Sequence, residues 1–251
     1  MKNLLTIGDA KTSKGEKLGY KTAILYMSPH KQNSTNVNLC PFATAGCASA
    51  CLYTAGRGKF SNVKRARIAK SEYFINDRDN FLATLFNEVR KLSKKYGKEL
   101  AIRLNGTTDI RYAKLKINGL NIFETFPDVQ FYDYTKNPNI VYDSIDYLNY
   151  SVTFSRAETN SNKTWANLFA KEKRANVAAV LNKELYDILF NKGTLESSSF
   201  KFLNLVNGDL HDLRFLDPIN SIICLKSKGD AKKDTSGFVI NTLDELLTLS
   251  N

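Results

Sequence analysis

Short apolar runs alternate with longer amphipathic segments along most of this 251-residue chain. Apolar runs of strand length predict strands, and segments whose apolar residues recur every three or four positions predict helices. The predicted strands are Thr22–Met27, Glu99–Leu104, Val129–Tyr134, Tyr150–Ser155, Asn176–Leu181, Phe202–Val206 and Ser221–Lys226.

The predicted helices fall between these strands. Ser61 or Asn62 begins one that runs to about Phe74, and Asp77 caps a second whose apolar residues recur at helical spacing as far as Leu92. The others are Ile117–Phe126, Asn139–Tyr147, Asn162–Lys173, Lys183–Phe190 and Thr242–Ser250. Strands that alternate with helices predict a parallel sheet with right-handed crossovers. We therefore expect one α/β domain over residues 1–251, a complete or partial (β/α) barrel of the TIM type, with an open doubly wound sheet as the alternative.

Polar residues follow nearly every predicted strand. In parallel α/β folds the carboxyl ends of the strands meet at one edge, where ligands bind. The residues that we expect to line a substrate cavity there are Arg103, Asn105, Asp109, Asp133, Lys136, Ser155, Arg156 and Asp209. Arg103 shares a strand face with Ala101, so a guanidinium inside a barrel would need a partner such as Asp133 or a bound anion. The alternative is a polar network that only closes the mouth of the barrel.

Three of the four cysteines, Cys40, Cys47 and Cys51, lie in one loop directly after the first predicted strand, with gaps of six and three residues. One disulfide would leave a third thiol over, and thiolates at this density are typical ligands of zinc or of iron–sulfur clusters. Structural zinc usually uses cysteine pairs separated by two residues, and neither gap here is two. The loop therefore favours a [4Fe–4S] cluster that is held by three cysteines and has one open iron.

The fourth iron site has several candidate ligands. His30 and His211 are the two histidines of the chain, and a small-molecule or anionic ligand is the alternative to either of them. Cys224 lies in the apolar run SIICLK and is expected to be buried in the core instead.

The chain carries a formal net charge of +11, which attracts polyanions or anionic substrates, although a lysine-rich surface alone would give the same charge. Its most basic stretch is Arg57–Lys70, which contains six basic residues and no acidic one. This stretch predicts contacts with nucleic-acid phosphates, or compensation for the negative charge of a cluster. No apolar run approaches the length of a membrane span, and the N-terminus lacks a signal-peptide core. We therefore expect a soluble, cytoplasmic protein.

A cysteine loop after the first strand of a (β/α) barrel resembles the radical S-adenosylmethionine superfamily. In that superfamily the open iron binds the amino and carboxylate groups of S-adenosylmethionine, whose sulfonium is then cleaved reductively, so the resemblance implies this cofactor. The usual signature of the superfamily has gaps of three and two residues and an aromatic residue next to the last cysteine. Here the gaps are six and three, and Ala50 precedes Cys51.

Segments spread over most of the chain resemble the phage gene 88 protein family. They are KTSKGEKLGYKTAILYMSP, CPFATAGCASACLYTAGRG, RLNGTTDI, FYDYTKNP, TFSRAETN, NGDLHDLRFLDP and KSKGDAKKDTSGFV. The resemblance implies a phage-encoded protein of the host cytoplasm, and these segments contain the predicted cysteine loop and strand ends. Three functions are compatible with the sequence. They are a cluster-dependent, radical-SAM-like enzyme, a nucleic-acid-binding or host-takeover protein with a structural cluster, and a redox or small-ligand cluster protein without S-adenosylmethionine chemistry.

Overall fold

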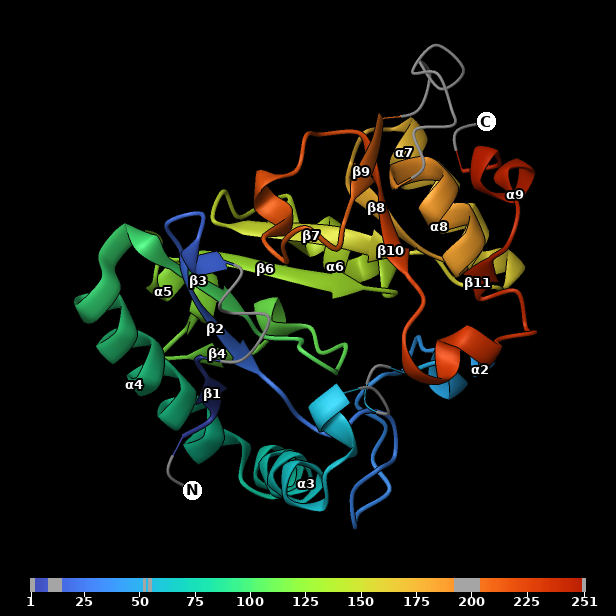
Figure 1. Cartoon of the computed structure of the whole chain (residues 1–251). Coiled ribbons are helices and arrows are strands. Elements are labelled where there is room, and N and C mark those ends of the chain that lie inside the picture. The colour runs from blue at the N-terminus through green and yellow to red at the C-terminus, as the bar shows by residue number, and fades with distance from the viewer. Residues whose placement is uncertain (1–2, 9–14, 52, 54–55, 192–203, 250–251) are drawn as a thin grey trace.

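A mostly parallel β-sheet runs through the molecule (Figure 1). The computed structural model describes residues 3–8, 15–51, 53, 56–191 and 204–249. The strands are β1 (Leu5–Thr6), β2 (Lys21–Leu25), β3 (Leu100–Arg103), β6 (Gln130–Thr135), β7 (Tyr150–Ser155), β8 (Asn176–Leu181), β9 (Asn204–Asn207), β10 (Ser221–Lys226) and β11 (Val239–Ile240). Their order is β1-β2-β3-β6-β7-β8-β10-β9, with β11 also paired to β8, and only β1 is antiparallel to its neighbour.

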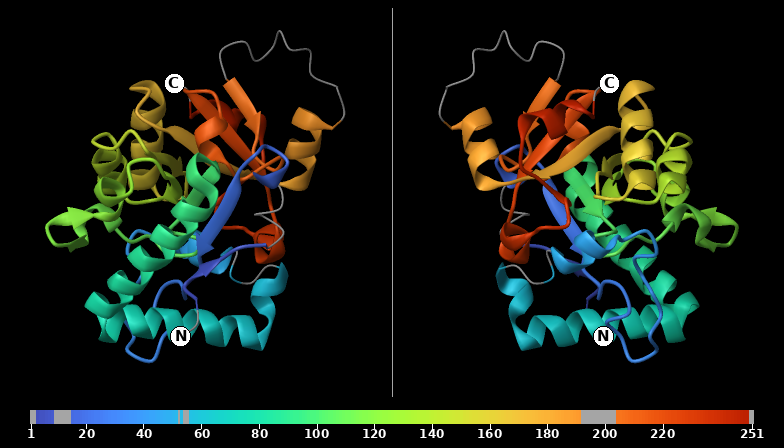
Figure 2. Two further views of the ribbon diagram at one scale, coloured as in Figure 1. Left: turned by 90° about the vertical axis from the view of Figure 1, so that its left-hand side faces the viewer. Right: turned by 90° about the vertical axis from the view of Figure 1, so that its right-hand side faces the viewer.

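Helices connect the parallel strands. They are α2 (Ala45–Ser49), α3 (Ser61–Asn76), α4 (Arg78–Tyr96), α5 (Ile122–Thr125), α6 (Pro138–Ser144), α7 (Asn160–Lys171), α8 (Lys183–Phe190) and α9 (Leu243–Leu247). Figure 2 places α3 and α4 at the end of the molecule that also holds β1, and α9 at the other end. In the ranges that the structure describes, no helix combines the length and the apolar character needed to cross a bilayer.

The connecting helices pack on one face of the sheet. Buried residues of α4, α6, α7 and α8 form a single apolar cluster with alternate residues of the strands, such as Ile102 and Phe131. The residues between them, Ala101 and Tyr132, face the opposite side and pack against Leu213. Because side chains alternate along a strand, this second face carries the side chains that point away from the helices.

The predicted α/β architecture with a parallel sheet is confirmed, but a closed barrel is not found. The end strands β1 and β9 do not pair with each other in the described part of the sheet. The strand predicted at Phe202–Val206 lies partly outside the described residues, and β9 begins at Asn204. The last predicted helix also ends beyond them, and α9 ends at Leu247.

The helix predicted over Ile117–Phe126 is wrong in its first half. That half is a hairpin of β4 (Lys116–Ile117) and β5 (Leu120–Asn121), which is followed by the short helix α5. Asn118 and Gly119 form its turn, with φ angles of 50° and 84°. Because an Asn-Gly pair adopts positive φ readily, it favours a tight hairpin over the continuation of a helix.

Candidate functional site

A cavity of about 290 Å³ opens at the carboxyl edge of the sheet. Its walls come from the segments that end or follow β2, β3, β6, β7, β8, β9 and β10, together with the cysteine loop. The predicted site residues that line it are Cys40, Cys47, Cys51, Arg103, Asn105, Asp109, Lys136, Ser155 and Asp209. The structure therefore brings the cysteines and most of the predicted polar residues into one site.

Helix α2 carries Cys47 and is fixed to the loop that follows β7. Thr44 caps the helix, since its hydroxyl accepts a hydrogen bond from the Cys47 amide at 3.1 Å. The carboxylate of Glu158 accepts hydrogen bonds from the Thr44 hydroxyl at 2.6 Å and from the Gly46 amide at 2.8 Å. A Cβ atom on Gly46 would lie 2.2 Å from the Ser236 hydroxyl, so only glycine permits this close packing. Glu158 thus holds the cysteine loop against the sheet.

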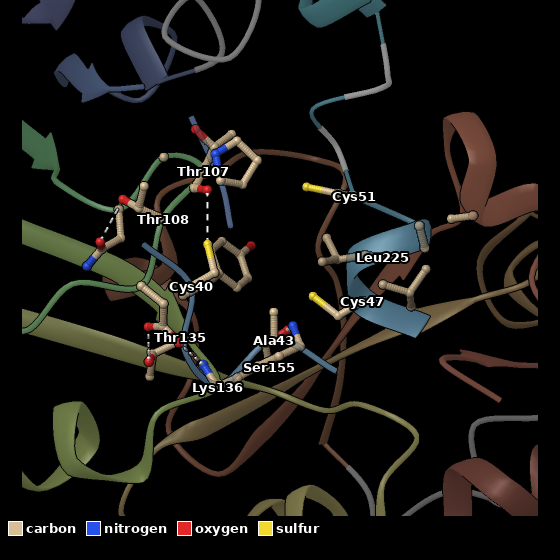
Figure 3. A pocket seen from close by; sticks show the side chains of 18 of the residues that line it. Cys40, Ala43, Cys47, Cys51, Thr107, Thr108, Thr135, Lys136, Ser155 and Leu225 are labelled. Carbon is tan, nitrogen blue, oxygen red and sulfur yellow. Dashed lines mark hydrogen bonds between the residues drawn. The ribbon is translucent and has the colours of Figure 1, made fainter. Parts of the chain in front are cut away.

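The sulfur atoms of Cys40, Cys47 and Cys51 surround one hollow (Figure 3). None of the four cysteines of the chain forms a disulfide. Cys40 is buried and donates a hydrogen bond to the Thr107 carbonyl at 3.5 Å, and Cys47 and Cys51 are half-buried. Burial raises the pKa of Cys40 to about 12 and also raises the pKa of Cys51. A bound metal centre would favour the thiolate forms of Cys40 and Cys51, which burial disfavours.

The positions of these sulfurs bear on the kind of metal. A single zinc ion needs several ligands that converge to within about 2.3 Å of one point. Over the described ranges, no group of three or more His, Cys, Asp or Glu side chains is placed to hold a metal ion. In a cubane cluster each cysteine binds a different iron, so the sulfurs surround a volume instead of meeting at a point. A cubane would therefore accept sulfurs that line a hollow, as those of Cys40, Cys47 and Cys51 do.

Arg103 lies on the cavity side of β3, as its alternation with Ile102 predicts, but its partner is not Asp133. Its Nη1 lies 3.0 Å from Oδ2 of Asp212, and its guanidinium lies 4.7 Å from the centre of the Tyr134 ring. Arg103 is 6% exposed, so this ion pair is almost fully buried. The pairing neutralises the guanidinium inside the molecule without a bound anion.

Asp133 and Arg156 do not line the cavity. Asp133 is fully buried on the helix-covered side, where it accepts hydrogen bonds from the Asn105 amide at 2.6 Å and the Tyr150 hydroxyl at 3.1 Å. Burial raises its pKa to about 7. Arg156 donates to the carbonyl of Phe238 at 2.9 Å, which holds the segment before β11. Both residues lie one position from a cavity-facing neighbour, and strand alternation turns them to the other face.

The wall formed by β6 and β7 joins Asp109, Lys136 and Ser155. The carboxylate of Asp109 accepts hydrogen bonds from the Thr135 hydroxyl at 2.5 Å and from the Lys136 amide at 3.1 Å. Burial raises the pKa of Asp109, and these hydrogen bonds act in the opposite direction. The Lys136 ammonium donates to the Ser155 hydroxyl at 2.8 Å and lies 5.4 Å from the centre of the Phe238 ring.

The part of the wall that follows β9 and β10 carries charged side chains that are paired with partners inside the chain. Asp209 accepts hydrogen bonds from the Lys226 amide at 2.9 Å and from the ammonium of Lys228. The Lys226 ammonium lies 2.7 Å from Asp187. This wall therefore brings little net charge to the cavity.

Both histidines line the cavity, but only His211 is tied to neighbouring side chains. Its Nδ1 lies 3.2 Å from the guanidinium of Arg214, and its Nε2 lies 3.8 Å from Asp217. Within the described residues, no hydrogen bond or ion pair is found for the imidazole of His30, whose φ is 52°. His30 lies in a turn, as its Pro-His-Lys context suggests, but it is half-buried and not exposed. Cys224, in contrast, is fully buried in the main core, as predicted.

The basic stretch Arg57–Lys70 covers the segment before α3 and the first part of that helix. Several of its charged side chains contact other residues of the chain. Lys70 is buried and donates a hydrogen bond of 2.5 Å to the main-chain carbonyl of Leu4. The guanidinium of Arg67 lies over two tyrosine rings, at 5.0 and 5.4 Å from their centres. The Lys64 ammonium lies 5.7 Å from the centre of one of these rings. Fewer of these side chains remain for phosphate contacts than the sequence suggests.

Sequence reasoning missed several residues of this cavity, among them Asp212 and Phe238. Asp212 neutralises Arg103 across 109 positions of the chain, and Phe238 closes the wall next to Lys136. Asp212 lies in NGDLHDLRF, a stretch rich in polar residues after a predicted strand, and that was a usable signal. Phe238 precedes β11, a strand of two residues that is too short to show a pattern.

Comparison with known proteins gives one match. The family model described as gene product 88 matches residues 3–242 of the chain. No curated protein and no solved structure matches it, so the resemblance to the radical S-adenosylmethionine superfamily has no support from these comparisons.

Proposed function

This chain belongs to the gene product 88 family, a family of phage proteins, and we propose that it binds a [4Fe–4S] cluster through Cys40, Cys47 and Cys51. The observation that carries the proposal is that these three sulfurs surround one hollow at the carboxyl edge of a parallel sheet. Three protein ligands leave the fourth iron open to the cavity. A small-molecule or anionic ligand is then the expected fourth ligand.

The surroundings of the cysteines support a cluster more than a zinc ion. The gaps of six and three residues between the cysteines differ from the two-residue gaps that are usual in structural zinc sites. The positive charges of Lys136 and Arg67 lower the pKa of Cys51, against the larger opposing effect of burial. The same two charges would offset part of the negative charge of a thiolate-bound cluster.

When bound, such a cluster supplies an electron-transfer centre and one Lewis-acidic iron. The protein side chains would hold the ligand of that iron in place. Lys136 and Ser155 offer hydrogen-bond donors at the cavity wall, and Asn105 lies at the end of β3 on the same cavity. The helices that pack on one face of the parallel sheet support the interpretation of the fold as a partial (β/α) barrel. The proposed activity is that of a cluster-dependent enzyme acting on a small polar molecule.

Anaerobic reconstitution with ⁵⁷Fe, followed by Mössbauer spectroscopy, tests this proposal. We expect about four irons and four sulfides per chain, and one iron whose signal changes when a small thiol is added. Zinc without sulfide, or a cluster in which the added ligand changes no iron, would overturn the proposal. Addition of S-adenosylmethionine with a reductant distinguishes two versions of the proposal, a radical enzyme and a site for another small ligand. Production of 5′-deoxyadenosine would assign radical chemistry, and a thiol response without that product would assign a small-ligand site.

A further inference from the structure

Four lysine and arginine side chains line the cavity, and three of them are paired with carboxylates. Arg103 is paired with Asp212, Lys226 with Asp187, and Lys228 with Asp209. The fourth is Lys136, for which no carboxylate lies within ion-pair distance in the described part of the chain. Lys136 is therefore the cation of this cavity that a ligand can neutralise.

The surroundings of Lys136 leave hydrogen-bonding capacity at its ammonium. One of its three N–H donors is used by the Ser155 hydroxyl at 2.8 Å. The carboxylate of Asp109, which lines the same cavity, already accepts hydrogen bonds at both oxygens, from the Thr135 hydroxyl and from the main-chain amide of Lys136. Two ammonium donors thus remain for a ligand.

The wall beside Lys136 is apolar. Phe238 lies under the ammonium, with its ring centre at 5.4 Å, and Ala231 packs with it in a small buried cluster. Leu225 and Val180 line the same cavity from neighbouring strands. A ligand that reaches Lys136 therefore passes along a surface suited to a short hydrocarbon body.

We propose that Lys136 binds the carboxylate of a small organic acid, whose apolar body packs against Phe238, Ala231 and Leu225 and whose second donor group reaches the cysteine-lined hollow. This inference rests on the proposed function for its iron end. The single unpaired charge favours a carboxylate over a phosphate dianion, which usually needs several donors. Figure 3 shows Lys136 and the cysteine sulfurs around the same hollow, and all of them line the one cavity of about 290 Å³ that the ligand would occupy.

Two matched thiols test the proposal. 3-Mercaptopropionate carries a thiol for the iron and a carboxylate for Lys136, and 3-mercaptopropionamide replaces the carboxylate by a neutral amide. Each is titrated into the reconstituted protein, and binding is followed by the absorption and electron paramagnetic resonance of the cluster. We expect the acid to bind roughly tenfold more tightly than the amide, because a charge-assisted hydrogen bond contributes more than a neutral one.

Substitutions test whether Lys136 causes the preference for the acid over the amide. Lys136→Met should abolish it and Lys136→Arg should restore part of it, with the two thiols compared in samples of matched iron and sulfide content. Lys59→Met removes the same charge from an exposed position that does not line the cavity, and it should keep the preference. Equal binding of the two thiols to the wild type, or a preference that survives Lys136→Met, would overturn the proposal.

A second measurement separates this proposal from the cluster itself. Saturation-transfer NMR of the same two thiols on iron-free protein reports the carboxylate contact without any metal. A stronger signal for the acid that is lost in Lys136→Met supports the Lys136 site even if reconstitution yields no cluster. Equal signals for the two thiols in the iron-free wild type would count against it, whatever the iron analysis shows.

Discussion

The buried carboxyl group of Asp133 should make the stability of the protein fall as the pH rises. Asp133 is fully buried at β6, and its hydrogen-bond donors are the Asn105 amide, the Asn105 side chain and the Tyr150 hydroxyl. Burial raises its pKa to about 7 from the ordinary value of 3.8, because the hydrogen bonds compensate only part of the cost of desolvating the charge.

The size and the sign of the effect follow from proton linkage. Between pH 4 and pH 7 the folded protein keeps a proton on Asp133 that the unfolded chain has lost, so the free energy of unfolding falls as the pH rises. Each tenfold difference in proton affinity is worth about 1.36 kcal/mol, so the interval from 3.8 to about 7 corresponds to about 4 kcal/mol. This stability is fully present below about pH 4 and is lost above about pH 7.

The assay is urea unfolding of the wild type and of Asp133→Asn at intervals from pH 4 to pH 8. Asparagine cannot ionise. We therefore expect the free energy of unfolding of the variant to fall by about 4 kcal/mol less than that of the wild type across this range. Asp128→Asn, at an exposed position, controls for the loss of one carboxylate. Parallel pH profiles for the wild type and Asp133→Asn would refute the reasoning.

Two further substitutions test the surroundings of the cavity. Gly46→Ala places a methyl group 2.2 Å from the Ser236 hydroxyl and 2.8 Å from the Glu158 carboxylate. We expect it to displace α2 and to lower the iron bound per chain, as measured by metal analysis after reconstitution. Arg103→Met removes the buried ion-pair partner of Asp212, and urea unfolding should show a loss of about 3–5 kcal/mol.

Each of these two predictions has a result that would contradict it. Wild-type iron content in Gly46→Ala would show that the tight contact between α2 and Glu158 does not position the cysteines. If Arg103→Met lowers the free energy of unfolding by less than about 1 kcal/mol, the ion pair contributes no more than a solvent-exposed pair does. That result would contradict the burial of Arg103 in the structure.

Local sequence patterns predict much of the sheet and the polar residues at its carboxyl edge. Strand positions follow from apolar runs, and the alternation of Ala101 with Ile102 places Arg103 on the cavity side, as the structure confirms. The polar residues after the strands meet at one cavity because parallel strands share a carboxyl edge. The same alternation would have placed Asp133 with Phe131, on the helix-covered face.

Contacts between distant segments are not visible in local patterns. The pairing of Arg103 with Asp212 depends on how the loop after β9 folds back over the sheet. β1 joins the sheet in the antiparallel direction through the pairing of Leu5 with Leu25. A strand of two residues is too short for its sequence to predict this pairing. The hairpin at Asn118 and Gly119 had a recognisable signal in its Asn-Gly pair, which the neighbouring apolar residues obscured.

Iron and acid-labile sulfide in anaerobically purified protein test the central claim most directly. The samples are the wild type, Cys40→Ala, Cys47→Ala, Cys51→Ala and, as the matched control, Cys224→Ala, whose thiol lies in the apolar core. The account predicts about four irons and four sulfides per chain in the wild type and in Cys224→Ala, with both lost or strongly reduced in each of the three loop variants. Wild-type iron and sulfide in any loop variant, or a wild type that binds neither after reconstitution, would contradict it.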